Sequence, residues 1–191
     1  MTPRIALAHL ISIIGHPLLL IPATVAFSAL RQGGSTTLAG TAIGAALAVT
    51  SCVFFYTLAK VRAARWVDTD ASNKHERIEL NLFLTALLAG ACLWAWMAGQ
   101  PAKLVAGLGF AGAIIVCALL LRAFVKLSLH VAFAVYGAFL LWPSIYGAAL
   151  VAVLACAVAW SRLALKRHQP ADIIAGAGAG VLAGLGFVLA G

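Results

Sequence analysis

The sequence predicts an all-α, polytopic transmembrane helical bundle of about seven helices. Of its 191 residues, 64% are hydrophobic and 9% are charged, whereas a soluble domain carries about 25% charged residues. The apolar residues gather into runs. The length of each run is close to that of a helix that crosses the hydrocarbon core of a bilayer, which is about 20 residues. The charged residues gather between these runs. We therefore expect a single membrane-embedded domain over residues 1–191.

Seven apolar runs follow one another along the chain. They are residues 5–30, 38–59, 78–98, 102–121, 127–142, 144–160 and 171–190. The first run is too long for a signal peptide, and His16-Pro17 and Pro22 interrupt it, so we expect it to be a retained helix. The fifth and sixth runs are short, and Trp142-Pro143 between them indicates a tight turn. The same pattern is compatible with six or eight crossings.

Three glycines in the last run, Gly176, Gly180 and Gly184, recur at every fourth residue. Such a stripe of small residues lies on one face of a helix and allows another helix to pack closely against it. We expect this face to pack within the bundle, with a homodimer through the same face as the alternative.

The basic residues are distributed very unevenly between the two predicted sides of the membrane. One side receives Arg4, Lys60, Arg62, Arg65, Lys74, Arg77, Arg122, Lys126, Arg162, Lys166 and Arg167, and the other receives Arg31 and Lys103. This bias points the charged side at the cytoplasm. With the Ala- and Gly-rich composition, it indicates a bacterial inner (plasma) membrane protein. The net charge of +8 suits anionic lipid head groups, and without an aromatic-rich basic domain we expect no nucleic-acid partner.

Three polar clusters interrupt the apolar runs, and all fall on the charged side. They are residues 68–77, 126–130 and 161–172. Because these clusters share one side of the membrane, we expect them to form a single site.

The residue types in these clusters suit phosphoryl transfer, which needs neutralised phosphate oxygens, a nucleophile in line and an acid for the leaving group. His168 and Asp172 lie four residues apart, on one face of a helix. Asp172 is placed to accept a hydrogen bond from one ring nitrogen of His168, so that the other nitrogen is free to attack phosphorus. His130, from another helix, is placed to protonate the leaving oxygen.

Four basic side chains are placed to hold the phosphate. Arg162 and Arg77 offer planar, bidentate donors, and Lys74 and Lys126 offer point charges. The predicted helix starts near His130 and His168 also direct backbone N–H groups at an anion.

At these positions the chain resembles the type 2 phosphatidic acid phosphatase superfamily. The third motif of that family is Ser-Arg, five residues, His, three residues, Asp, and Ser161, Arg162, His168 and Asp172 match it in full. The second motif, Pro-Ser-Gly-His, retains Ser128 and His130 here within Leu-Ser-Leu-His. The first motif, Lys, six residues, Arg-Pro, retains only Arg77. Asp70 stands in the register of its lysine, and Lys74 is a candidate replacement.

The resemblance implies a metal-independent phosphatase acting on a lipid-linked phosphate or diphosphate, with no cofactor. The substrates it implies are phosphatidic acid, phosphatidylglycerol phosphate and polyprenyl phosphates or diphosphates. His168 would form a phosphohistidine, Asp172 would orient it, and His130 would be the general acid. The positions implied to bind phosphate are Arg162, Arg77, Ser128, Lys74, Ser161 and Lys126. It also implies a six-helix core, to which the first run adds a leading helix.

Two other functions are compatible with the sequence. One is a non-catalytic protein that binds or transports an anionic lipid on the same scaffold. The other is a prenyl transferase that holds magnesium diphosphate through Asp68 and Asp70, although such enzymes use two aspartate-rich clusters. His9 and His16 share the first run, and we expect them to be packed side chains, with contact to haem or a quinone as the alternative.

Overall fold

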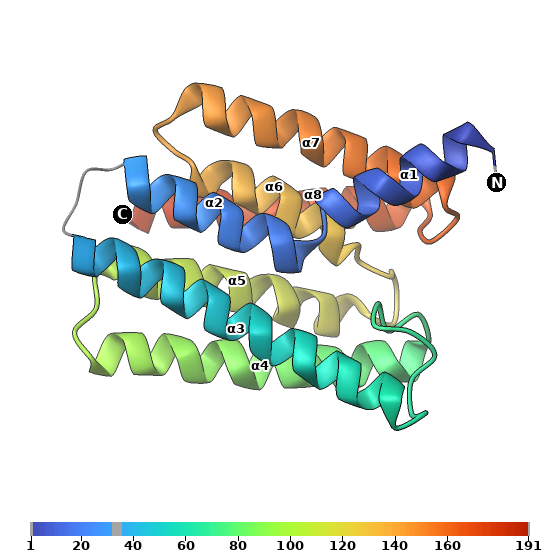
Figure 1. The fold of residues 1–191 in the computed structure, drawn as a ribbon, viewed down its shortest axis with the longest axis horizontal. Helices are drawn as coiled ribbons and strands as arrows, with labels where there is room; N and C mark the ends of the chain where they lie inside the picture. The colour runs from blue at the N-terminus through green and yellow to red at the C-terminus, as the bar shows by residue number, and fades with distance from the viewer. Residues whose placement is uncertain (1, 32–35, 191) are drawn as a thin grey trace.

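The structure is a bundle of α-helices, as the sequence predicts. This computed structural model describes residues 2–31 and 36–190, which form eight helices arranged along one long axis (Figure 1). The helices are α1 (Pro3–Ile14), α2 (Pro17–Arg31), α3 (Thr36–Arg62), α4 (Lys74–Met97), α5 (Ala102–Leu121), α6 (Leu129–Leu140), α7 (Ile145–Ala164) and α8 (Pro170–Ala190). Among the described residues, α3, α4, α5, α7 and α8 are each long and apolar enough to cross a membrane. The chain is therefore a multi-pass membrane protein.

The first apolar run forms two helices, so the single helix expected there is wrong. α1 and α2 meet at 51° and together qualify as one broken span. Pro17 has no N–H to donate, and its ring conflicts with the carbonyl group one turn earlier, which favours a break in the helix before it. His16 therefore lies at the break, between the two helices.

The shortest predicted crossing corresponds to α6, which occupies the centre of the bundle. Its 12 residues cover about 18 Å at 1.5 Å per residue, less than the about 30 Å of a hydrocarbon core. Most of its side chains are buried, and it packs against α8, α7, α2 and α5. Because α6 is surrounded by protein, it does not need the length of a helix that faces lipid on its own.

The glycine stripe of α8 faces α6. A Cβ atom added at Gly176 would lie 2.6 Å from the carbonyl oxygen of Ser128, and one at Gly180 would lie 2.5 Å from that of Ala132. At Gly184 an added Cβ would collide with the ring of Phe139. The expected packing within the bundle is confirmed. The alternative of a homodimer through this face stays a prediction, and a partner helix there would have to share the face with α6.

The three polar connections lie at the same end of the bundle. Residues 63–73 join α3 to α4, residues 122–128 join α5 to α6, and residues 165–169 join α7 to α8. All three lie at the right-hand end in Figure 1, where the chain also begins. Sequence segments far apart in the chain therefore converge, as the charge pattern predicted.

Partly buried hydrogen bonds hold the connection at residues 63–73 against α4. The indole N–H of Trp66, a residue only 5% exposed, donates to Glu79 Oε2 at 2.9 Å. Glu76 Oε1 accepts from the backbone N–H of Val67 at 3.0 Å, and Glu76 Oε2 accepts from that of Asn73 at 3.3 Å. These contacts fix the loop that carries the first polar cluster.

Candidate active site

His168 and Asp172 form a hydrogen-bonded pair at the start of α8. Pro170 occupies the first position of this helix, where its missing N–H leaves no hydrogen bond unmade. His168 Nδ1 lies 3.3 Å from Asp172 Oδ2, and the side chains are 7% and 11% exposed. The backbone N–H of Gln169 donates to the same carboxylate oxygen at 2.9 Å. The contact predicted between the two side chains is confirmed, and it leaves Nε2 of His168 free of Asp172.

The other carboxylate oxygen of Asp172 holds the second polar cluster in place. Asp172 Oδ1 accepts from the backbone N–H of Lys126 at 3.0 Å, and the carbonyl oxygen of Asp172 accepts from the N–H of Ser128 at 3.1 Å. The close approach of α8 to α6 at Gly176 allows these bonds to form. Asp172 therefore orients His168 and also fixes the connection that leads to His130.

The surroundings of His168 favour its uncharged form. Burial, together with the nearby positive charges of Arg162 and Lys126, lowers the pKa of His168 to about 4. Burial and the neighbouring Arg77 also lower the pKa of Lys126. At neutral pH the imidazole therefore carries one proton, and the hydrogen bond to Asp172 places it on Nδ1, which leaves a lone pair on Nε2.

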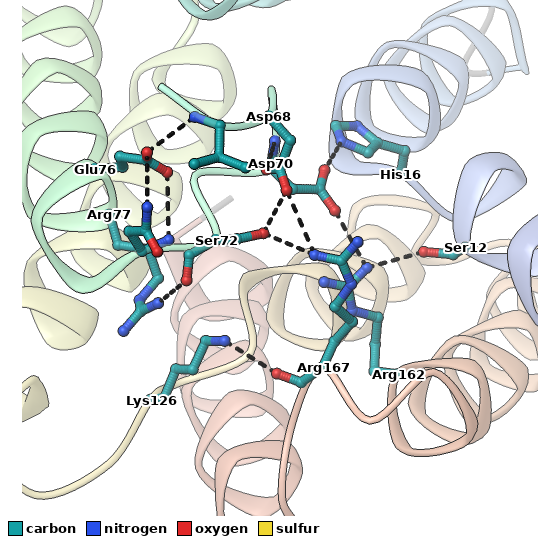
Figure 2. Close-up of polar contacts among 12 residues, drawn as sticks. Ser12, His16, Asp68, Asp70, Ser72, Glu76, Arg77, Lys126, Arg162 and Arg167 are labelled. Carbon is teal, nitrogen blue, oxygen red and sulfur yellow. Dashed lines mark hydrogen bonds and ion pairs between the residues drawn. The ribbon is translucent and has the colours of Figure 1, made fainter. Parts of the chain in front are cut away.

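Arg162 is buried beneath the first polar cluster, with 7% of its side chain exposed. Its Nη1 donates to Ser12 Oγ of α1 at 2.9 Å and lies 3.5 Å from Asp70 Oδ2. Its Nε is buried and has no hydrogen-bond partner among residues 2–31 and 36–190. Figure 2 shows Arg162 between Ser12 and Asp70. No signal in the sequence distinguished Ser12 from other polar residues of the first run.

Asp70 links Arg162 to His16 (Figure 2). Asp70 Oδ1 lies 3.4 Å from His16 Nε2, and the hydrogen bond with His16 and the positive charge of Arg162 hold the pKa of Asp70 well below its usual range. The ring of His16 meets that of His130 edge-on, with 4.8 Å between ring centres. His16 thus belongs to the site, and its sequence signal was its place beside the proline that breaks the first run. His9 is exposed on α1, so the two histidines do not share a helix.

Candidate metal ligands in the described part of the chain include one cluster, formed by His16, Asp70 and His130, whose donor atoms lie within 4.8 Å of one another. However, His16 Nδ1 accepts a hydrogen bond from the backbone N–H of Leu18 at 3.2 Å, so the ring proton belongs on Nε2, facing Asp70. A metal-bound imidazole usually donates its second N–H instead. The arrangement therefore suits a hydrogen-bonded His–Asp pair better than a metal site.

Four of the six residues predicted to bind phosphate line one cavity together with His168 and His130. The basic side chains on its wall near these histidines include Lys74, Arg77, Lys126, Arg162 and Arg167. Arg77 Nη1 donates to the carbonyl oxygen of Ser72 at 2.6 Å, and Lys126 Nζ donates to that of Arg167 at 3.0 Å. Arg167, which we expected mainly to set the membrane topology through its charge, also donates to Ser72 Oγ at 2.7 Å.

The two serines predicted to bind phosphate do not line this cavity. Ser128 and Ser161 are both completely buried, and the hydroxyl group of Ser161 donates to the carbonyl oxygen of Val158 in its own helix at 2.8 Å. The tight packing of α6, α7 and α8 encloses both hydroxyl groups in this structure, and contact of these serines with phosphate stays a prediction. Ser128 Oγ has no hydrogen-bond partner among the described residues, so its hydroxyl group is not held by a bond of the kind that Ser161 makes.

The cavity has a polar end and a long apolar body, with a volume of about 490 Å³. The polar end contains the basic side chains and the three imidazoles of His16, His130 and His168. The body continues between α2, α3, α4, α5 and α6 toward the opposite end of the bundle, where Lys103 lies. Such a shape suits an amphiphile with an anionic head group.

Comparison with known proteins gives no relative for this chain: no protein-family model, curated protein or solved structure matches it.

Proposed function

We propose that this protein is a membrane phosphatase that hydrolyses a lipid-linked phosphate or diphosphate without a metal ion. The observation that carries the proposal is His168, oriented by Asp172, at the basic end of a cavity whose body is apolar. The cations attract the phosphate and the apolar body accepts the lipid chain. A neutral imidazole with a free lone pair on Nε2 is a suitable nucleophile for phosphorus.

The arrangement supports a two-step reaction. The guanidinium groups of Arg162 and Arg77 and the ammonium groups of Lys74 and Lys126 neutralise the phosphate oxygens. His168 Nε2 attacks phosphorus, and an N–P bond forms as the bond from phosphorus to the leaving oxygen breaks. The positive charge that develops on the ring is stabilised by Asp172. Burial and the charge of Arg162 lower the pKa of His130 well below its usual range, so His130 has to take up a proton as the phosphate anion enters the site, and it gives this proton to the leaving oxygen.

The second step returns the enzyme to its starting state. His130, now neutral, accepts a proton from a water molecule as the water oxygen attacks phosphorus. The N–P bond breaks, inorganic phosphate leaves, and His168 regains its lone pair on Nε2. Every proton and bond is accounted for by His168, His130, water and substrate, so the reaction needs no cofactor.

The chain's likeness to the type 2 phosphatidic acid phosphatases supports this reaction, with one local difference. Asp70 occupies the register of the lysine of the first motif and pairs with Arg162. In the proposal, Lys74 on the cavity wall supplies the missing positive charge. Phosphatidic acid, phosphatidylglycerol phosphate and polyprenyl phosphates or diphosphates all have the required head group. In the proposal the site faces the cytoplasm of a bacterial cell from the inner membrane, as the charge bias of the sequence favours.

The proposal is tested by trapping the intermediate. Purified protein in detergent is mixed with substrates carrying labelled phosphate, and the reaction is quenched in base, in which a phosphohistidine is the expected stable product. We expect labelled protein and phosphate release from the wild type and the His75→Ala control, whose side chain is exposed on α4. We expect neither from His168→Ala. Full hydrolysis by His168→Ala would exclude the proposed nucleophile.

A second candidate function is non-catalytic binding or transport of an anionic lipid. It is favoured by the ion pair between Asp70 and Arg162 and by the extent of the cavity, which has a basic residue at both ends. This candidate predicts lipid binding with no phosphate release from any phospholipid phosphate tested. A prenyl transferase is less well supported, because Asp68 and Asp70 pair with Arg167 and Arg162 and are not free to hold magnesium ions.

A further inference from the structure

The apolar body of the cavity runs almost the whole length of the bundle. Along α5 its wall extends from Lys103 to Arg122, and the 20 residues of this helix cover about 30 Å at 1.5 Å per residue. Along α3 the wall extends from Leu38, at the end opposite the active site, to Thr57 near the active site. The cavity is therefore about as long as a bilayer's hydrocarbon core is thick.

One face of α3 forms this wall along most of the helix. The lining residues recur with helical spacing and include Ala39, Ala42, Ala46, Val49, Val53 and Thr57. The first three have small side chains, so the part of the cavity farthest from the active site stays open. α3 itself packs mainly on α2 and less on α4. This leaves its inner face available to a hydrocarbon chain lying between α3 and α5.

The length of the cavity is informative because ordinary acyl chains are shorter. A hydrocarbon core about 30 Å thick contains two leaflets, so an acyl chain attached to a head group at one face reaches about half of that distance. A chain that fills the cavity from His168 to Lys103 has to be about twice as long as a leaflet is thick.

Building on the proposed phosphatase activity, we propose that the cavity selects substrates whose phosphate is attached to one hydrocarbon chain longer than a leaflet, as in polyisoprenyl phosphates and diphosphates. The phosphate lies among the cations at the polar end, and the chain extends along α3 and α5 toward Lys103. Diacyl glycerol phosphates have two shorter chains and leave the far part of the cavity unfilled. Ala42, which lines that far part, is a position that determines specificity for chain length.

The inference is tested with phosphate monoesters of isoprenoid alcohols of increasing length, and with a diacyl glycerol phosphate, in detergent. Ala42 precedes Thr57 by about four helical turns, so a Phe at position 42 blocks only the distal part of the cavity. The matched control is Ala48→Phe, because Ala48 is exposed on α3 and is not among the residues that line the cavity. Both variants add the same side chain to the same helix.

For the wild type and Ala48→Phe, we expect kcat/KM to rise with chain length beyond that of an ordinary acyl chain, by about tenfold or more in total. For Ala42→Phe, we expect short substrates to react normally and the gain for long chains to be lost. A wild type that prefers the diacyl lipid, or an unchanged response to length in Ala42→Phe, would overturn the inference.

Equilibrium binding of labelled long-chain and short-chain phosphates separates this inference from the proposed activity. If no substrate is hydrolysed but long chains bind more tightly to the wild type than to Ala42→Phe, the phosphatase proposal fails and the chain-binding cavity stands. If short and long substrates are hydrolysed equally well by all three proteins, the phosphatase proposal stands and the chain-length inference fails.

Discussion

Asp70 Oδ2 lies 3.5 Å from Nη1 of Arg162, so a carboxylate from the connection between α3 and α4 neutralises the arginine of the strongest motif in the chain. The same carboxylate group lies 3.4 Å from His16 Nε2 through its other oxygen. Asp70 therefore joins the break between α1 and α2 to α7. Nε of Arg162 keeps no partner among the described residues, which leaves a buried donor beside the proposed phosphate site.

Replacing Asp70 with Asn is expected to lower stability and to increase the response to phosphate. The variant leaves the buried guanidinium group of Arg162 without its charged acceptor, at a cost of about 1–3 kcal/mol. Inorganic phosphate should then stabilise the variant more than the wild type, because it binds the folded state at the vacated charge. Thermal unfolding in detergent, with and without phosphate, measures both effects.

Asp68→Asn is the matched control for this experiment. Asp68 lies 3.6 Å from Nη1 of Arg167, in a more exposed pair, so its loss should cost less than about 1 kcal/mol. If phosphate increased the thermal stability of Asp70→Asn and of the wild type equally, the result would contradict a role for Asp70 in neutralising the anion site.

Replacing Asp172 with Asn is expected to slow turnover far more than it weakens substrate binding. An Asn side chain has only one acceptor oxygen, whereas Asp172 accepts from His168, Gln169 and the backbone of Lys126. Loss of orientation and of the charge that stabilises the imidazolium should lower kcat about 100-fold or more, with little change in KM. Steady-state kinetics on one lipid phosphate make the comparison, and unchanged kcat would exclude the orienting role.

The ring of His168 is expected to become protonated only at acidic pH. Because burial and the charges of Arg162 and Lys126 lower the pKa of His168 to about 4, the nucleophilic form persists at neutral pH and is lost only as the pH falls through that value. Lys126→Met removes one repelling charge and should raise the pKa of His168. NMR titration of the ring, assigned with His168→Asn, measures both values; a wild-type pKa near the ordinary value of about 6.5 would refute the effect of the surroundings.

The effect of replacing a glycine of α8 on the free energy of unfolding is expected to depend on the helix face that the glycine occupies. A methyl group at Gly176 would lie 2.6 Å from the carbonyl oxygen of Ser128, so Gly176→Ala should destabilise the protein by about 1–3 kcal/mol. Gly178 meets nothing within 4 Å on the same helix, and Gly178→Ala should be neutral or stabilising by up to about 1 kcal/mol. Detergent unfolding curves compare the two, and equal effects would argue against the close contact between α8 and α6.

The two histidines of the first apolar run are expected to differ in importance. His16→Ala removes the partner of Asp70 and the edge contact with His130, whereas His9→Ala changes an exposed side chain on α1. We expect reduced kcat/KM for His16→Ala and wild-type activity for His9→Ala, measured at matched folded fractions. Equal activities of the two variants would contradict a role for His16 in the site.

Much of the site was predictable because its residues lie in short, polar interruptions of long apolar runs. The four-residue spacing of His168 and Asp172 predicted their contact, although His168 lies two residues before α8 begins and not on the helix face expected. Alternation of antiparallel helices brings residues 68–77, 126–130 and 161–172 to one end. The glycine spacing in α8 similarly predicted close packing of that helix. These features depend on the spacing of residues and on the length of each apolar run relative to the thickness of a bilayer. Both can be counted along the sequence.

The partners of those residues were decided by the tertiary structure. The pairing of Asp70 with Arg162 and His16, the donation from Arg162 to Ser12 and the enclosure of Ser128 and Ser161 all join helices that are distant in the chain. A sequence shows that a buried charge needs a partner, but the identity of the partner depends on how helices rotate and tilt when they pack. The same packing keeps the inner face of α3 separate from α5, and the space between the two helices forms the long cavity. No local pattern in the sequence predicted this cavity.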